Sequence, residues 1–290
     1  MNTTIALSGK LSIDSDIDTL TYDWKLISSP TNQNSSVPSF ENNISTIVNP
    51  SIRLDQSGEY IFSLTVNDGT VDSVSDTVTI YVGILQHKGY VYGTVKSPFT
   101  DRIWLDRNIG ASRVCTAYND TQCYGDNFQW GRNADGHEKL SSATTTTLAS
   151  DVNIVGASFI KNISSPRDWT TTDSSGSIRG SNWSKTDGSS VCPVGYRVPT
   201  INELKEETID SSDYTDGRTE AFNNFLKFPS AGDRKGSTGI NGSRGTYSYI
   251  WSSTFTESSS KSYAIFFLTD TSHATNIYRA NGNSIRCIKH

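Results

Sequence analysis

The chain has 290 residues, with 30 acidic and 25 basic side chains, so its formal net charge is −5. This length predicts about two domains. The mild acidity and the lack of a Lys/Arg cluster argue against a nucleic-acid partner. No apolar run approaches the roughly 20 residues of a membrane-spanning helix, so we expect no membrane insertion. The first residues show no signal peptide, and we expect a monomeric excerpt of a longer protein.

Residues 1–84 predict short strands between polar turns. Apolar and polar residues alternate over residues 20–26, 60–66 and 76–82, and residues 67–69 (Asn-Asp-Gly) supply a turn. Trp24 lies mid-strand, where immunoglobulin-type sandwiches keep a core tryptophan. The pattern predicts an all-β, Ig-like sandwich that serves as a spacer.

Residues 55–60 (DQSGEY) resemble the D-x-x-G-x-Y corner, in which a tyrosine hydroxyl bonds back to the chain. Residues 14–82 resemble PKD and related Ig-like repeats, which string bacterial surface proteins together. The turn with Asp14, Asp16 and Asp18 is not an EF-hand, because Thr19 stands where the glycine belongs. In related repeats an acidic turn at this place can bind calcium, and a solvated turn is the equal alternative.

Residues 85–89 predict a short, semi-rigid connector to a second domain at residues 90–290. There Thr200 and Glu203 form a capping box that predicts a helix start, and residues 219–226 predict a second helix. Residues 133–191 predict little regular structure. We therefore expect metal ions and tryptophan side chains, rather than apolar burial, to order this stretch.

The four cysteines include no C-x-x-C pair, and with only 4 histidines a zinc site is not expected. Two disulfides fit better and place the protein outside a reducing cytosol. Three connectivities are open, and of these we favour Cys115 with Cys123 and Cys192 with Cys287.

The second domain contains six ordered motifs: residues 101–111 (DRIWLDRNIGA), 124–132 (YGDNFQWGR) with 135–137 (DGH), 165–169 (SPRDW), 192–200 (CPVGYRVPT), 249–254 (YIWSST) and 279–287 (RANGNSIRC). Together they resemble the Fibrobacter succinogenes major paralogous (FISUMP) family. The resemblance implies an α+β, C-type-lectin-like fold with long ordered loops. An Ig-like repeat followed by such a domain also resembles the ligand-binding region of RTX adhesins, whose related domain binds peptides with the help of calcium.

Calcium takes six to eight oxygen ligands, and the irregular stretch is rich in Asp and Asn. The fold resemblance makes calcium the expected cofactor, against the alternative that surface loops are always rich in these residues. The expected metal ligands are Asp126, Asp135, Asp168, Asp173, Asn182 and Asp187.

Aromatic rings and a Gly-rich loop (residues 232–245) are the candidates for ligand contact. Core packing is the alternative for the tryptophans and is favoured for Trp104 and Trp251, while a solvated loop is the alternative for the Gly-rich stretch. The expected ligand-binding residues are Trp130, Arg132, Trp169, Asp233, Arg234, Asn241, Arg244 and Tyr249.

The chain offers little for catalysis, because its histidines are scattered and no nucleophile motif is present. The resemblance implies a secreted, calcium-dependent adhesin region at the bacterial cell surface that binds peptide or protein termini and is not an enzyme. The alternative is a glycan-binding module. Residues 251–253 read Trp-Ser-Ser, without the triplets with which C-type lectins chelate sugars through calcium.

Overall fold

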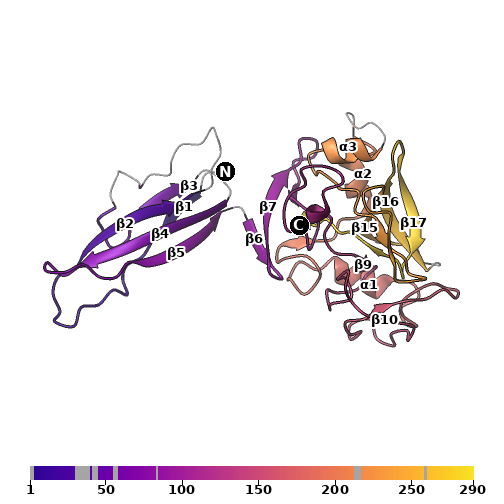
Figure 1. Ribbon diagram of the computed structural model, residues 1–290, viewed down its shortest axis with the longest axis horizontal. Helices are drawn as coiled ribbons and strands as arrows, with labels where there is room; N and C mark the ends of the chain where they lie inside the picture. Colours follow the sequence, from indigo (N-terminus) through magenta and orange to yellow (C-terminus); the bar gives the residue numbers. More distant parts are fainter. Residues whose placement is uncertain are drawn as a thin grey trace. The chain divides into compact units, whose positions relative to one another are not determined.

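The computed structural model describes residues 3–29, 40, 45–54, 58–82, 84–211, 217–257 and 260–290. The chain forms two compact units, Met1–Leu85 (unit 1) and Gln86–His290 (unit 2), and both are built mostly of strands (Figure 1). None of the described helices has the length and apolar character needed to cross a membrane.

Unit 1 is a small β-sandwich. Strands β1 (Thr3–Ala6) and β3 (Ser51–Leu54) pair antiparallel, and β2 (Thr21–Ser28), β4 (Gly58–Asn67) and β5 (Asp76–Val82) form a second antiparallel sheet in the order β2-β4-β5. Alternate residues of the strands face inward and share one core. Its buried members are Leu7, Trp24, Ile52, Leu54, Tyr60, Phe62 and Val82.

The predicted strands and turn of unit 1 are confirmed. Trp24 is 5% exposed in β2, and Gly69 follows Asn67 in a turn closed by the Asn67 side chain at 2.7 Å. In the acidic turn, the carboxylate of Asp14 accepts the backbone N–H groups of Asp16 and Asp18 at 2.8 and 3.2 Å. Asp14 therefore acts as a turn-forming side chain. The predicted corner begins at residues 55–57, outside the described residues.

Unit 2 has two larger sheets. The first has the order β12-β19-β8-β7-β6. Its strands are β12 (Tyr196–Arg197), β19 (Ile288–Lys289), β8 (Ile103–Leu105), β7 (Tyr90–Lys96) and β6 (Ile84–His87). The second is an antiparallel meander of β15 (Ser248–Phe255), β16 (Lys261–Phe267) and β17 (Ser272–Tyr278).

Short strands tie the loops of unit 2 together. Four of them form a sheet in the order β14-β13-β18-β9, and β10 pairs with β11 in parallel. They are β14 (Asn241–Gly242), β13 (Asp233–Arg234), β18 (Gly282–Asn283), β9 (Phe128–Gln129), β10 (Thr144–Thr145) and β11 (Phe159–Ile160). A 3-10 turn, η2 (Thr121–Cys123), follows β8 along the chain.

Three short helices are found among the described residues of unit 2: α1 (Ser177–Trp183), α2 (Ile201–Glu206) and α3 (Arg218–Asn223). The main core lies among α2, α3, the meander, β8 and β19. Its buried residues are Trp104, Ile201, Leu204, Ala221, Leu226, Phe228, Ile250, Ile265, Phe267 and Ile288.

The structure differs from the sequence expectation at three places. Residues 85–87 were expected in a connector. They belong to β6, which is the last strand in the order of the five-stranded sheet. The second expected helix ends at Asn223 instead of residue 226. Helix α1 was not expected, because its sequence SIRGSNW has weak helix propensity. It forms because the Asp173 carboxylate accepts the N–H groups of Ile178 and Arg179.

The favoured disulfide pairing is confirmed, with Cys115 bonded to Cys123 and Cys192 to Cys287. The second bond joins residues 95 positions apart and links the loop before β12 to the end of the chain. In the chain-entropy model a closure of this length stabilises the fold by about 4–5 kcal/mol. Both disulfides fit an extracellular or secreted protein.

The predicted cap of α2 is present and generates an acid-stability prediction. The Glu203 carboxylate accepts a hydrogen bond from the Thr200 N–H at 2.8 Å. It also accepts two hydrogen bonds from the Arg197 guanidinium, at 2.8 and 2.6 Å. Burial alone would raise the pKa of Glu203, but these bonds outweigh it and hold the pKa at about 2, below its ordinary 4.5. Because the folded-state pKa is depressed, this stabilisation is complete above pH 4.5 and is lost as the pH falls towards 2.

Glu203→Gln should therefore lower the free energy of unfolding by about 1–2 kcal/mol at pH 7, after allowance for solvent screening, and by little at pH 2. Urea denaturation at both pH values measures the difference. Glu220→Gln, in the first turn of α3, is the matched control and should change neither value. An equal loss at both pH values for Glu203→Gln would contradict the assignment.

Candidate functional site

The long loops of unit 2 pack on an alternating stack of guanidinium groups and indole rings, which we call the Arg–Trp stack. Its members in order are Arg132, Trp169, Arg179, Trp130 and Arg279, and all five are fully buried. Each guanidinium carbon lies 4.9–5.7 Å from the neighbouring ring centroid. Desolvation strengthens such cation–π contacts. Gly131 leaves room for the stack, since a Cβ there would lie 2.3 Å from the Cβ of Arg179.

Three carboxylates balance the three guanidinium charges. Asp168 accepts two bonds from Arg179 at 2.7 and 2.9 Å and lies 3.6 Å from Arg279. Asp173 accepts a hydrogen bond from the Nε–H of Arg179 at 3.1 Å. Asp135 accepts one from the Nε–H of Arg132 at 2.9 Å. Burial alone would raise the pKa of Asp173, but the backbone N–H groups of α1 and the Arg179 guanidinium lower it. These carboxylates are therefore charged partners of arginine.

The other expected metal ligands lie apart from this group. Asp126 contacts the ammonium of Lys139 at 2.6 Å, although burial raises its pKa. Asn182 donates to the side chain of Asn153 at 3.0 Å. Asp187 is exposed and closes a turn with Ser189. The six expected ligands do not converge, and three of them are neutralised by the stack.

Within the described residues, one group of three His, Cys, Asp or Glu side chains brings its ligand atoms within 4.8 Å of one another: Asp135, His137 and Glu138. Both ring nitrogens of His137 are in use. Nε2 accepts the Gln129 N–H at 3.0 Å, which leaves the proton on Nδ1 for the bond to Asp135 at 2.7 Å. Burial lowers the pKa of His137, so the ring is neutral. With no free nitrogen and with Asp135 bound to Arg132, this group does not fit a metal ion, and the expected calcium ligands do not fit a shared calcium site.

Three of the expected ligand-binding residues need correction. Trp130, Trp169 and Arg132 are fully buried in the Arg–Trp stack and cannot present a surface to a ligand. The indole N–H groups bond to carbonyls in the interior. That of Trp169 donates to the Trp130 carbonyl and that of Trp130 to the Ser252 carbonyl, both at 2.8 Å. Trp104 and Trp251 are also fully buried, as favoured. The rings act in packing.

The Gly-rich loop is packed against its neighbours. Arg234 is 2% exposed and donates to the carbonyls of His137, Lys139 and Ser142 at 3.2, 3.1 and 2.9 Å. The guanidinium of Arg244 lies over the Tyr124 ring at 4.7 Å. Asn241 is half-buried in β14.

Two further expected ligand-binding residues differ in exposure: Asp233 in β13 is 1% exposed, whereas Tyr249 in β15 is half-buried. Asp233 accepts the hydroxyl of Tyr247 at 3.0 Å and the ammonium of Lys235 at 3.1 Å. Tyr249 stacks on Phe266 with centroids 4.5 Å apart. Asp233 is therefore committed to interior contacts, and Tyr249 is the partly exposed member of the two.

A pocket of about 510 Å³ opens beside the Arg–Trp stack. It lies between the loop of residues 148–174 and two residues that stand between β15 and β16 in the chain, Glu257 and Ser260. The lining is rich in hydroxyls and carries two carboxylates: Leu148, Pro166, Asp168, Thr170, Thr171, Thr172, Ser174, Glu257 and Ser260. Sequence reasoning found only Asp168, and the signal it missed was the run of three threonines directly after Trp169.

Arg279 holds both walls of this pocket. Its guanidinium donates to the Ser174 and Ser175 carbonyls at 2.9 Å on one side and to the Thr256 carbonyl at 3.1 Å on the other. Its backbone N–H donates to the Ser260 carbonyl at 2.9 Å. Because one buried side chain fixes both walls, the shape of the pocket is set before a ligand binds.

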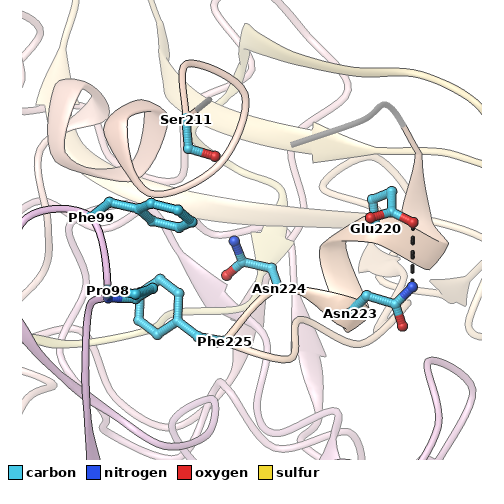
Figure 2. A pocket seen from close by; sticks show the side chains of 7 residues that line it. All are labelled: Pro98, Phe99, Ser211, Glu220, Asn223, Asn224 and Phe225. Atoms are coloured by element: carbon cyan, nitrogen blue, oxygen red, sulfur yellow. Dashed lines mark hydrogen bonds between the residues drawn. The ribbon is translucent and has the colours of Figure 1, made fainter. Parts of the chain in front are cut away.

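A second pocket of about 190 Å³ lies near α3, at the end of β7 (Figure 2). Phe99 and Phe225 meet there edge to face with centroids 6.1 Å apart, and Asn223 is turned towards Glu220, to which it donates at 3.3 Å. The side-chain amide of Asn224 donates to the Glu207 carbonyl and accepts a hydrogen bond from the Leu226 N–H. Its small size and satisfied amides make this pocket the weaker candidate.

The balance of charges in the stack predicts which acidic residues matter. Asp168→Asn leaves buried guanidinium charge unpaired and should lower the free energy of unfolding by about 3–5 kcal/mol. Asp187→Asn, at an exposed turn, is the matched control and should leave the free energy of unfolding nearly unchanged. Urea denaturation of both variants, with and without a calcium chelator, measures these effects.

The chelator should leave the unfolding midpoint of the wild-type chain unchanged, because arginines neutralise the loop carboxylates. Equal losses for the two variants, together with a midpoint that falls on chelation, would show that an ion holds the loops.

Comparison with known proteins gives a family for unit 1. Residues 1–82 match the family model described as K319L-like, PKD domain. No curated protein and no solved structure matches the chain. The two-sheet sandwich and the core position of Trp24 agree with the family match. Residues 1–82 are therefore a K319L-like PKD domain, as the resemblance to PKD repeats predicted.

Proposed function

We propose that the chain is the ligand-binding region of a bacterial cell-surface adhesin of the RTX type. In this proposal the PKD domain is a spacer, and unit 2, a FISUMP domain of C-type-lectin-like fold, binds peptide or protein termini on another cell. The observation that carries the proposal is the pocket whose walls Arg279 holds. The PKD match and the two disulfides support an extracellular setting.

The lining chemistry favours a peptide end that carries a positive charge. Both carboxylates line the pocket, and Glu257 is exposed whereas Asp168 is buried. Thr171, Thr172 and Ser174 add exposed hydroxyls that can bond to a peptide backbone. An N-terminal ammonium next to Glu257 would form a charge-assisted hydrogen bond. We therefore favour free N-termini among the possible peptide ends.

Recognition without turnover fits the groups in the pocket. The described lining residues include no His and no Cys, and Asp168 is committed to two arginines. All four cysteines are in disulfides, so no thiol is free for a paired-cysteine copper site of the kind used by formylglycine-generating enzymes. A fixed pocket without an activated nucleophile suits binding.

Calcium is not needed for this mechanism. The loops already have their charges balanced and their carbonyls bonded by buried arginines. A preformed site loses less conformational entropy when a ligand binds, which favours affinity. We accordingly expect binding to persist in a chelator.

A glycan ligand is the second candidate, and the hydroxyl-rich lining favours it. Five Thr and Ser residues line the pocket together with the two carboxylates: Thr170, Thr171, Thr172, Ser174 and Ser260. Carboxylates and hydroxyls can accept and donate hydrogen bonds to sugar hydroxyls. Arrays separate the two candidates directly.

The test compares arrays of peptides with a free N-terminus, with a free C-terminus or with both ends blocked, and a glycan array, each in calcium and in chelator. Peptides with a free N-terminus should bind in both buffers. Enrichment on glycans alone would replace the proposal by the glycan candidate, and no binding on any array would contradict both.

Two variants place the ligand in the pocket. Thr172→Trp should fill it and abolish binding, and Glu257→Gln should weaken binding of ammonium-bearing peptides about 10-fold, which corresponds to about 1.4 kcal/mol. Both residues are exposed, so the melting temperature should not change. Glu220→Gln, in the second pocket, is the control. Unchanged affinity in both pocket variants would show that the ligand binds elsewhere.

A further inference from the structure

Strand β17 forms an edge of the meander sheet (Figure 1). All seven of its residues, Ser272–Tyr278, pair with β16 in one uninterrupted antiparallel register. Among the described residues no other strand or bridge pairs with β17. A regular edge strand of this length offers unpaired backbone groups to another chain.

The register shows which backbone groups point outward. The Leu268 N–H bonds to the Thr271 carbonyl, and the Arg279 N–H bonds to the Ser260 carbonyl, so odd-numbered residues face β16. In an antiparallel pair the inward and outward residues alternate. The N–H and C=O groups of Ala274 and Asn276 therefore point away from the sheet, and both residues are at least partly exposed.

Strand β17 lacks the features that protect natural edges. Its sequence, SHATNIY, has no Lys, no Pro and no acidic residue, and no bulge interrupts its pairing. By contrast, the outer strand β2 in unit 1 carries Lys25 and a register shift between Leu26 and Ser28.

A row of aromatic side chains crosses the meander and ends on β17. Tyr249, Phe266 and His273 lie directly opposite one another on β15, β16 and β17. Tyr249 and Phe266 stack at 4.5 Å, and Phe266 meets His273 edge to face at 5.3 Å. None of the three is buried. We call this set the aromatic row.

An added strand would continue the aromatic row. His273 directs its backbone groups towards β16, so a residue opposite it on the outer side would occupy a non-hydrogen-bonded pair. In such pairs the Cα atoms lie about 4.5 Å apart and the side chains are closest. A large apolar side chain there would pack on His273, and aromatic cross-strand pairs of this kind contribute about 0.2–1 kcal/mol.

We propose that β17 binds an extended peptide segment of a partner protein as a fourth strand of the meander. The segment pairs its backbone with Ala274 and Asn276 and places an apolar or aromatic side chain beside His273. Only an extended chain offers N–H and C=O groups at the repeat that β17 presents. The ligand class is the one in the proposed function, but this surface recognises the middle of a peptide instead of its end.

The test uses a probe that cannot enter the pocket by its ends. It is an acetylated and amidated nonapeptide of alternating Thr and Val with a central Phe, and binding to the full chain is measured by fluorescence anisotropy. Asn276→Pro removes one outward N–H and leaves the bonds to β16 in place, because that N–H does not face β16. It should weaken binding at least 10-fold, whereas Asn276→Thr, which keeps the N–H, should bind within 2-fold of wild type.

A second measurement does not depend on a variant that folds. Methylation of alternate amides of the probe should abolish binding in one register and spare it in the other. His273→Thr should weaken binding of the Phe probe more than that of an all-Thr/Val probe. Thr172→Trp should leave this binding unchanged, which separates the edge from the pocket.

Equal binding to wild type and Asn276→Pro, or to both methylated probes, would overturn the proposal. A chain that dimerises in solution and becomes monomeric on Asn276→Pro, with no affinity for the probe, would also overturn it, since the edge would then pair with a second copy.

Discussion

The order of unit 2 depends on the burial of arginine guanidinium groups between indole rings. An unpaired buried charge costs several kcal/mol, so the arrangement is stable only if each guanidinium finds carboxylates, carbonyls and ring faces at once. Arg179 does so with Asp168 and Asp173 and with the two rings that flank it. The loops supply these partners from distant parts of the chain. Their conformation is therefore fixed by the need to satisfy the charges.

The same principle appears without carboxylates at two further places. Arg286 is fully buried and donates to the Leu105 and Leu226 carbonyls and to the Asn108 side chain, and burial lowers its pKa to about 9. Arg234 donates to four backbone carbonyls, those of His137, Lys139, Ser142 and Gly239. A guanidinium carries five donors in a plane, which suits it to bind several backbone carbonyls of an irregular segment. Backbone groups that no sheet satisfies are satisfied in this way.

Much of the regular structure could be predicted from local patterns. The alternation in β5, the capping box of Thr200 and Glu203 and the pairing of the cysteines depend on neighbouring residues or on a small set of choices. The candidate site could not be predicted in the same way. An Asp-rich loop suits calcium or arginine equally, and contacts across the chain decide between them, such as that between Arg279 and the Ser174 carbonyl, 105 residues away. For the same reason Trp130 and Trp169, which fit a ligand platform by composition, turn out to separate the buried charges.

The two surfaces proposed for binding share one residue of this network. Arg279 directly follows β17, and its backbone N–H continues the pairing with the β16 side through Ser260. Its side chain donates to carbonyls of both walls of the pocket. The end of the edge strand and the shape of the pocket are thus set by the same buried charge. Since preorganisation reduces the entropy lost on binding, a single buried arginine would support affinity at both proposed sites. A neutral side chain at position 279 would lack the donors that bond to both walls and the positive charge that faces Asp168.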